Sequence, residues 1–147
     1  MLSFLKVFLH KEGLTVSQNN VYRNFNLLLV IALSDLVVIG FSLKDIQPNW
    51  PFKICVAEFI CYVVLMLFHV RGYMIFARYS TFLISLLVQV TACITHGKTA
   101  GFDYVFYAIG LLPMLFFQRP GYYTSLFMIS IVTMLAIQYA YLFIEPV

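Results

Sequence analysis

Long apolar stretches alternate with short polar segments along this chain of 147 residues. The apolar stretches cover residues 25–43, 54–70, 74–95, 103–117 and 122–144. A helix rises 1.5 Å per residue, so about 20 apolar residues cross the ~30 Å hydrocarbon core of a bilayer. The pattern therefore predicts an all-α fold, a polytopic transmembrane helical bundle with about five membrane-spanning helices.

The polar segments between these stretches predict the organisation of the chain. Residues 1–24 are expected to form a cytoplasmic amphipathic amino-terminal segment, and residues 25–147 a single bundle. Trp50, in the loop after the first span, is typical of an anchor at the membrane interface. Pro113 lies inside the fourth stretch and lacks a backbone N–H, so a hinge or kink is expected there.

Composition supports a membrane protein and narrows its partners. Hydrophobic residues make up 63% of the chain and charged residues 10%, whereas a soluble domain has about 25% charged residues. The net charge of +3 is small and dispersed, so no nucleic-acid partner is expected. Three cysteines are too few for a disulfide framework or a Cys-x-x-Cys metal site. The lipid bilayer is the predicted partner, without a metal or another cofactor.

Basic residues near the span ends predict the orientation. Six of them fall on the side of the amino terminus: Lys6, Lys11, Arg23, Arg71, Arg78 and Arg119. Three fall on the opposite side: Lys44, Lys53 and Lys98. This excess favours a multi-pass protein of the cytoplasmic (inner) membrane with its amino terminus in the cytoplasm.

Polar side chains inside the predicted spans are the candidate site residues, because a carboxylate in a membrane helix costs a few kcal/mol. The set is Asp35, Glu58, Gln89, Tyr104, Tyr107 and Gln138. With a cytoplasmic amino terminus, Asp35 falls near mid-depth and the others in the outer half of the bilayer. Two interpretations stay open: a ligand pocket that opens to the outside, and hydrogen bonds that pack neighbouring helices together.

The turn between the second and third spans contains Arg71, Gly72 and Arg78, and the two arginines are expected to contact anionic lipid headgroups. No phosphate-binding loop, dinucleotide fingerprint, His-Glu-x-x-His pair or Gly-x-Ser-x-Gly elbow occurs in the sequence. The chain as given is therefore not expected to be an enzyme.

Three segments form a recognisable set: residues 23–29 (RNFNLLL) at the start of the first span, residues 71–78 (RGYMIFAR) at the turn into the third, and residues 107–117 (YAIGLLPMLFF) in the fourth. In this order they resemble the first helix, the turn into the third helix and the fourth helix of a membrane sensor module. That module precedes histidine kinase or adenylate/guanylate cyclase domains in bacteria, especially the Bacteroidetes group. Such modules usually have six membrane helices followed by a cytoplasmic output domain, so this chain is expected to be a receptor truncated after the fifth helix. The resemblance also implies a homodimer.

These observations predict a membrane-embedded sensory or receptor module for a small extracellular or lipophilic signal, with the kinase or cyclase output domain missing. The alternative is a small membrane transporter, or a membrane-complex subunit without catalytic activity. A transport pathway needs polar groups at both depths, and the inner halves of the spans carry mainly serines. A structural or assembly protein without a ligand is the third possibility.

Overall fold

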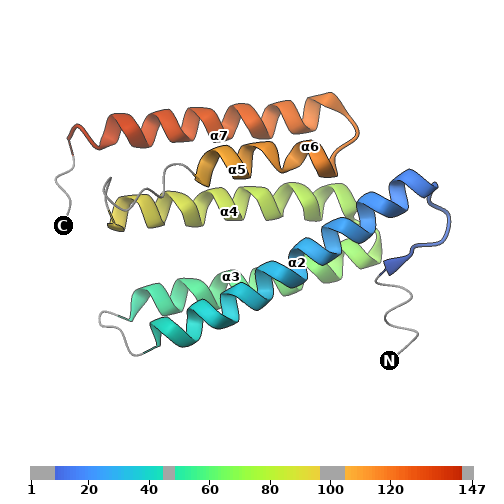
Figure 1. Ribbon diagram of the computed structural model, residues 1–147, viewed down its shortest axis with the longest axis horizontal. Helices are drawn as coiled ribbons and strands as arrows, with labels where there is room; N and C mark the ends of the chain where they lie inside the picture. The colour runs from blue at the N-terminus through green and yellow to red at the C-terminus, as the bar shows by residue number, and fades with distance from the viewer. Residues whose placement is uncertain (1–8, 45–48, 97–104, 144–147) are drawn as a thin grey trace. The chain divides into compact units, whose positions relative to one another are not determined.

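The computed structural model describes residues 9–44, 49–96 and 105–143, where all regular structure is helical (Figure 1). Four helices are long and apolar enough to cross a membrane: α2 (Val16–Leu43), α3 (Trp50–Arg71), α4 (Met74–His96) and α7 (Pro120–Ala140). Residues 105–116 form two shorter helices, α5 (Val105–Leu111) and α6 (Pro113–Phe116). The all-α fold, with helices long and apolar enough to cross a membrane, is therefore confirmed for the described residues, whereas the count of five spans is not.

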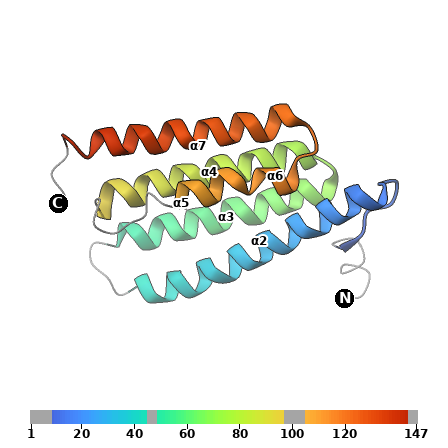
Figure 2. The same ribbon diagram turned by 45° about the horizontal axis from the view of Figure 1, so that its top comes forward.

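The chain divides into two compact units, residues 1–80 and residues 81–147. In the first unit, α2 and α3 contact each other as an antiparallel hairpin, and the first residues of α4 follow (Figure 1). The second unit contains the remainder of α4 together with α5, α6 and α7, and both short helices contact α7 (Figure 2).

Helix α2 begins at Val16, inside the segment that the sequence analysis placed before the first span. A capping box fixes this start, because the Thr15 hydroxyl accepts from the Gln18 amide at 3.3 Å. In return, the Gln18 side chain accepts from the Thr15 amide at 3.0 Å. The polar residues after Thr15 are thus helical, although their side chains are too polar to be recognised as part of an apolar span.

Helix α3 begins at Trp50, which the sequence analysis placed in a loop, and Pro51 occupies its first turn. Proline is tolerated there because the amide that it lacks has no partner within the helix. The helix ends at Arg71 and is followed by Gly72, whose φ of 114° is left-handed. The Tyr73 amide bonds to the Phe68 carbonyl and the two rings make an edge contact, which is a Schellman motif. This motif turns the chain directly into α4.

In the second unit, α4, α5 and α7 share an apolar core of Leu86, Cys93, Phe106, Met134 and Ile137. The buried Ser130 hydroxyl of α7 donates to the Phe106 carbonyl of α5 at 2.6 Å. A Cβ atom at Gly110 would lie 3.1 Å from Cβ and Oγ of Ser130. The absence of a side chain at Gly110 therefore lets α5 and α7 approach each other closely.

The helix is interrupted at the position where the sequence analysis placed a hinge. Helix α5 ends at Leu111 and α6 starts at Pro113. The Leu112 amide still bonds to the Ala108 carbonyl at 3.0 Å, but Pro113 has no N–H to continue the series. The proline thus accounts for the two short helices, while a moving hinge stays a prediction.

Candidate functional site

A buried polar cluster joins α2, α3 and the start of α4 in the first unit. The side chains of Asn26 and His69 are 0% exposed. The Nδ1 atom of His69 lies 2.7 Å from Oδ1 of Asn26, and Nε of Arg78 donates to Nε2 of His69 at 3.1 Å. One imidazole therefore connects side chains from two other helices.

The two bonds fix the protonation of His69. The Arg78 Nε–H is a donor only, so Nε2 of His69 must accept through its lone pair. The ring proton then resides on Nδ1 and is donated to the Asn26 carbonyl oxygen. His69 is thus a neutral imidazole with one defined tautomer, and protonation of Nε2 would remove its bond with Arg78.

Aromatic side chains of α2 enclose this imidazole. The Tyr22 ring stacks on it with centroids 4.8 Å apart and an interplanar angle of 15°. The Phe25 ring packs at 4.7 Å and also lies 5.8 Å from the Arg78 guanidinium carbon, within range of a cation–π interaction. We call Tyr22, Phe25, Asn26, His69 and Arg78 the polar centre.

Lys11 lies beside the polar centre, at the turn between α3 and α4. Its backbone amide bonds to Oδ1 of Asn19 at 2.9 Å, and its ammonium donates to the Val70 carbonyl at 3.2 Å. A Cβ atom at Gly72 would lie 3.1 Å from this ammonium nitrogen. Glycine is therefore required at position 72 for the left-handed turn and favoured for the contact with Lys11.

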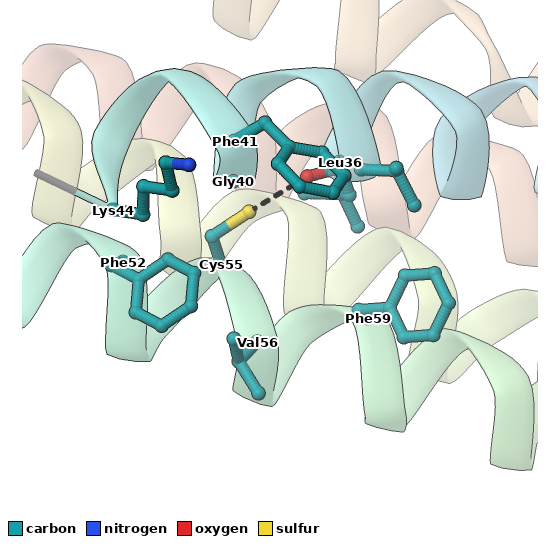
Figure 3. A pocket seen from close by; sticks show the side chains of 9 residues that line it. Leu36, Gly40, Phe41, Lys44, Phe52, Cys55, Val56 and Phe59 are labelled. Atoms are coloured by element: carbon teal, nitrogen blue, oxygen red, sulfur yellow. Dashed lines mark hydrogen bonds between the residues drawn. The ribbon is translucent and has the colours of Figure 1, made fainter.

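An apolar groove lies where α2 ends and α3 begins, away from the polar centre along the same two helices (Figure 3). Its volume is about 280 Å³. The described residues that line it are Leu36, Val37, Gly40, Phe41, Lys44, Phe52, Cys55, Val56 and Phe59. The Cys55 thiol donates to the Leu36 carbonyl at 3.1 Å, which joins α2 to α3 beneath the groove.

Two of the predicted pocket residues belong to the first unit. Asp35 is exposed on α2 and is not among the residues that line the groove. Glu58 of α3 is partly buried, and the Tyr62 hydroxyl one turn further along donates to its carboxylate. This bond lies within α3, so both the pocket and the interhelical packing interpretation of Glu58 stay predictions.

The other predicted pocket residues belong to the second unit. Gln89 of α4 is buried and its amide donates to the Cys93 sulfur at 3.8 Å, a pairing within one helix. Tyr107 of α5 is exposed and Gln138 of α7 is partly buried. Tyr104 lies outside the described residues. Because the set is divided between two units, a shared pocket stays a prediction.

Sequence reasoning placed Arg78 at the headgroups and did not find its bond with His69. Arg71 is exposed, as expected of a residue at a helix end, and Gly72 forms the turn. The missed members of the polar centre had one signal. Tyr22, Phe25 and Asn26 share one helix face by their spacing of three and four residues, at a point where the span was expected to begin.

Comparison of the chain with family models, with curated proteins and with solved structures finds no match. Within residues 9–44, 49–96 and 105–143, no group of three or more His, Cys, Asp or Glu side chains converges as a metal site would require. Cys55, Cys61 and Cys93 are free thiols. The polar centre and the apolar groove are therefore the two features from which a function can be argued.

Proposed function

We propose that the chain is a membrane-embedded sensory or receptor module that takes a small lipophilic signal into the apolar groove. One observation carries this proposal: the groove lies between α2 and α3, the same two helices that the polar centre connects elsewhere along their length. A ligand that separates the helices at the groove would thereby change the geometry of the polar centre.

The polar centre suits the task of transmission. Hydrogen bonds are directional, so a small shift of α2 against α3 lengthens the bond between Asn26 and His69. His69 also bonds to Arg78 of α4, whose displacement would carry the change into the rest of the chain. The mechanism requires that the ligand bind two helix arrangements with different affinity.

The wider assignment rests on sequence arguments. The excess of lysine and arginine on the amino-terminal side supports the cytoplasmic membrane with an inward amino terminus. The resemblance to bacterial sensor modules supports a kinase or cyclase output domain beyond this chain, and a homodimer. Catalysis would then belong to that domain, and this chain would bind the signal.

The test is an NMR titration of the full chain in phosphatidylcholine nanodiscs, with ¹⁵N-labelled histidine and decanol as the lipophilic probe. His69 is one of three histidines, so the variant His69→Gln assigns its ring nitrogens. We expect decanol to shift the His69 resonances. Gly40→Leu, which places a bulky side chain in the groove, should abolish the shift.

The matched control is Ala57→Leu, which places the same leucine side chain on α3 at an exposed position outside the groove. This variant should respond to decanol as the unmodified chain does. Absence of a His69 shift in the unmodified chain would contradict the proposal. An equal shift in Gly40→Leu would show that the groove is not the binding site.

One observation favours a second candidate, a membrane-complex subunit without catalytic activity. Asp35 is exposed on α2, between Arg23 and Lys44, which are about 31 Å apart along the helix. This length matches the hydrocarbon core, so a carboxylate between them is costly unless another helix pairs with it. For a subunit, Asp35→Leu should reduce the mass of the native complex on gels, whereas Gly40→Leu should not.

A further inference from the structure

We infer that the ligand of the apolar groove is a single-chain amphiphile with an anionic head, of the fatty-acid class. Its carboxylate would lie at Lys44 and its acyl chain along the groove. This inference rests on the proposed function, because it names the chemical class of ligand for the same groove.

The charge distribution of the groove supports an anionic head. Lys44 is the one charged side chain among the described residues that line the groove, and the others are apolar or weakly polar. Its ammonium lies 5.8 Å from the centroid of the Phe41 ring, so it is held beside the groove wall (Figure 3). A carboxylate at this end would meet a positive charge, while a cationic head would be repelled.

The walls offer little to a polar ligand body. The side chains of Leu36, Phe52, Val56 and Phe59 are apolar, and the Cys55 thiol already donates to a backbone carbonyl. A ligand with hydroxyl or amide groups along its length would lose hydrogen bonds with water and gain none here. An acyl chain loses none, and each buried methylene contributes about 0.8 kcal/mol.

The dimensions of the groove favour one chain of medium length. Leu36 and Lys44 are eight residues apart, or about 12 Å along α2. A zigzag chain of roughly ten carbons with bonds of about 1.5 Å covers this length. The volume of about 280 Å³ lies just below the range of about 300–1,000 Å³ for ligand pockets, so the groove suits a small ligand. The proposed occupant is therefore a free fatty acid and not a two-chain bilayer phospholipid.

The experiment uses the full chain in phosphatidylcholine nanodiscs at pH 8, where a fatty acid head is ionised. A decanoic acid with a diazirine near its tail is photo-crosslinked, and the labelled peptides of α2 and α3 are identified by mass spectrometry. Unlabelled decanoate, decanol and decyltrimethylammonium then compete for the site. We expect decanoate to compete at a concentration roughly tenfold lower than decanol, and decyltrimethylammonium to be the weakest competitor.

Variants of one lysine test the role of the head. Lys44→Gln should raise the decanoate concentration needed for competition about tenfold and leave that of decanol unchanged. Lys44→Arg, which keeps the charge, should retain most of the preference. The matched control is Lys53→Gln, since Lys53 is an exposed lysine of α3 outside the groove.

The outcomes separate this inference from the proposed function. Equal competition by decanoate and decanol, with no effect of Lys44→Gln, would overturn the anionic head while the groove remains a lipophilic site. Crosslinking that no competitor reduces would indicate annular lipid contact only, and would overturn both proposals. Loss of decanoate preference in Lys53→Gln as well would show that the head responds to general surface charge and not to Lys44.

Discussion

The polar centre of the first unit and the apolar core of the second join their helices by different means. In the polar centre, the imidazole of His69 bonds to side chains of α2 and α4. In the core of the second unit, α5 and α7 approach closely because Gly110 faces Ser130, and apolar side chains fill the remaining space. The first junction depends on hydrogen bonds among side chains, whereas the second combines close packing with one hydrogen bond, from the Ser130 hydroxyl to the Phe106 carbonyl.

This difference matters because lipid is as apolar as the helices that it surrounds. Burial of apolar surface therefore drives helix association weakly in a bilayer, and close packing and interhelical hydrogen bonds take its place. A junction that depends on a few directional bonds can change state when one bond breaks. A close-packed junction resists gradual deformation. The comparison predicts that substitutions in the polar centre and in the apolar core of the second unit destabilise the protein for different reasons.

The largest effect is expected for His69→Leu, which removes the central partner of the polar centre at similar volume. We predict a loss of about 3 kcal/mol in the free energy of unfolding, because the buried Asn26 amide and the partly buried Arg78 guanidinium each lose a hydrogen bond. The measurement is SDS-induced unfolding in mixed micelles, followed by circular dichroism.

A double-mutant cycle with Asn26→Leu sharpens this prediction. If the bond between Asn26 and His69 carries the effect, the double variant should lose less than the sum of the two single variants. Additive losses would show that the bond between Asn26 and His69 contributes nothing, and the effect of His69→Leu would then come from its bond with Arg78 and from packing.

The second effect is expected for Gly110→Val in the other unit. A Cβ at this position would already be 3.1 Å from Ser130, so the branched side chain must separate α5 from α7. Overpacking of this kind costs about 2 kcal/mol. The control is Gly121→Val on α7, where no heavy atom lies within 4 Å of an added Cβ. Equal losses in the same unfolding assay would show that helix propensity and not shape explains the result.

The sequence was sufficient to predict long apolar helices, because runs of about 20 apolar residues are typical of helices that cross a bilayer. The sequence was less informative where a local interaction decides at which residue a helix starts or ends. The start of α2 depends on a capping box between Thr15 and Gln18, within a polar stretch that hydropathy does not recognise. The apolar pattern across residues 103–117 suggested one span, although Pro113 divides the described part of it into two helices.

The candidate site was harder to predict than the fold. The candidate residues were polar side chains grouped by their depth in single spans, and depth does not reveal which helix faces meet. The bond between Asn26 and His69 joins α2 to α3, and the Gly72 turn then leads into the first residues of α4, where Arg78 reaches the imidazole. The groove is apolar apart from Lys44, so a search for polar residues could not find it.

A smaller effect is expected for Gly72→Ala at the turn beside the polar centre. The left-handed φ of 114° costs an alanine about 1–2 kcal/mol, and the added methyl must also displace the Lys11 ammonium. Gly13→Ala provides the control, because Gly13 has a φ of 84° with no atom near an added Cβ. The difference between their unfolding free energies isolates the Lys11 contact, and equal values would show that this contact contributes nothing.

The smallest effect, and one of opposite sign, is expected for Gly40→Ala beside the apolar groove. An added Cβ would lie 3.6 Å from the Cys55 sulfur, which is an ordinary contact, and alanine stabilises a helix interior by about 0.5–1 kcal/mol relative to glycine. The variant should therefore unfold at higher SDS concentration while binding decanoate more weakly, because the methyl occupies part of the groove. Higher stability together with weaker binding would indicate that Gly40 keeps the groove open for the ligand at a cost in stability. Stabilisation with unchanged binding would instead mean that the ligand does not reach position 40, and the acyl chain would have to lie closer to Phe52 and Lys44.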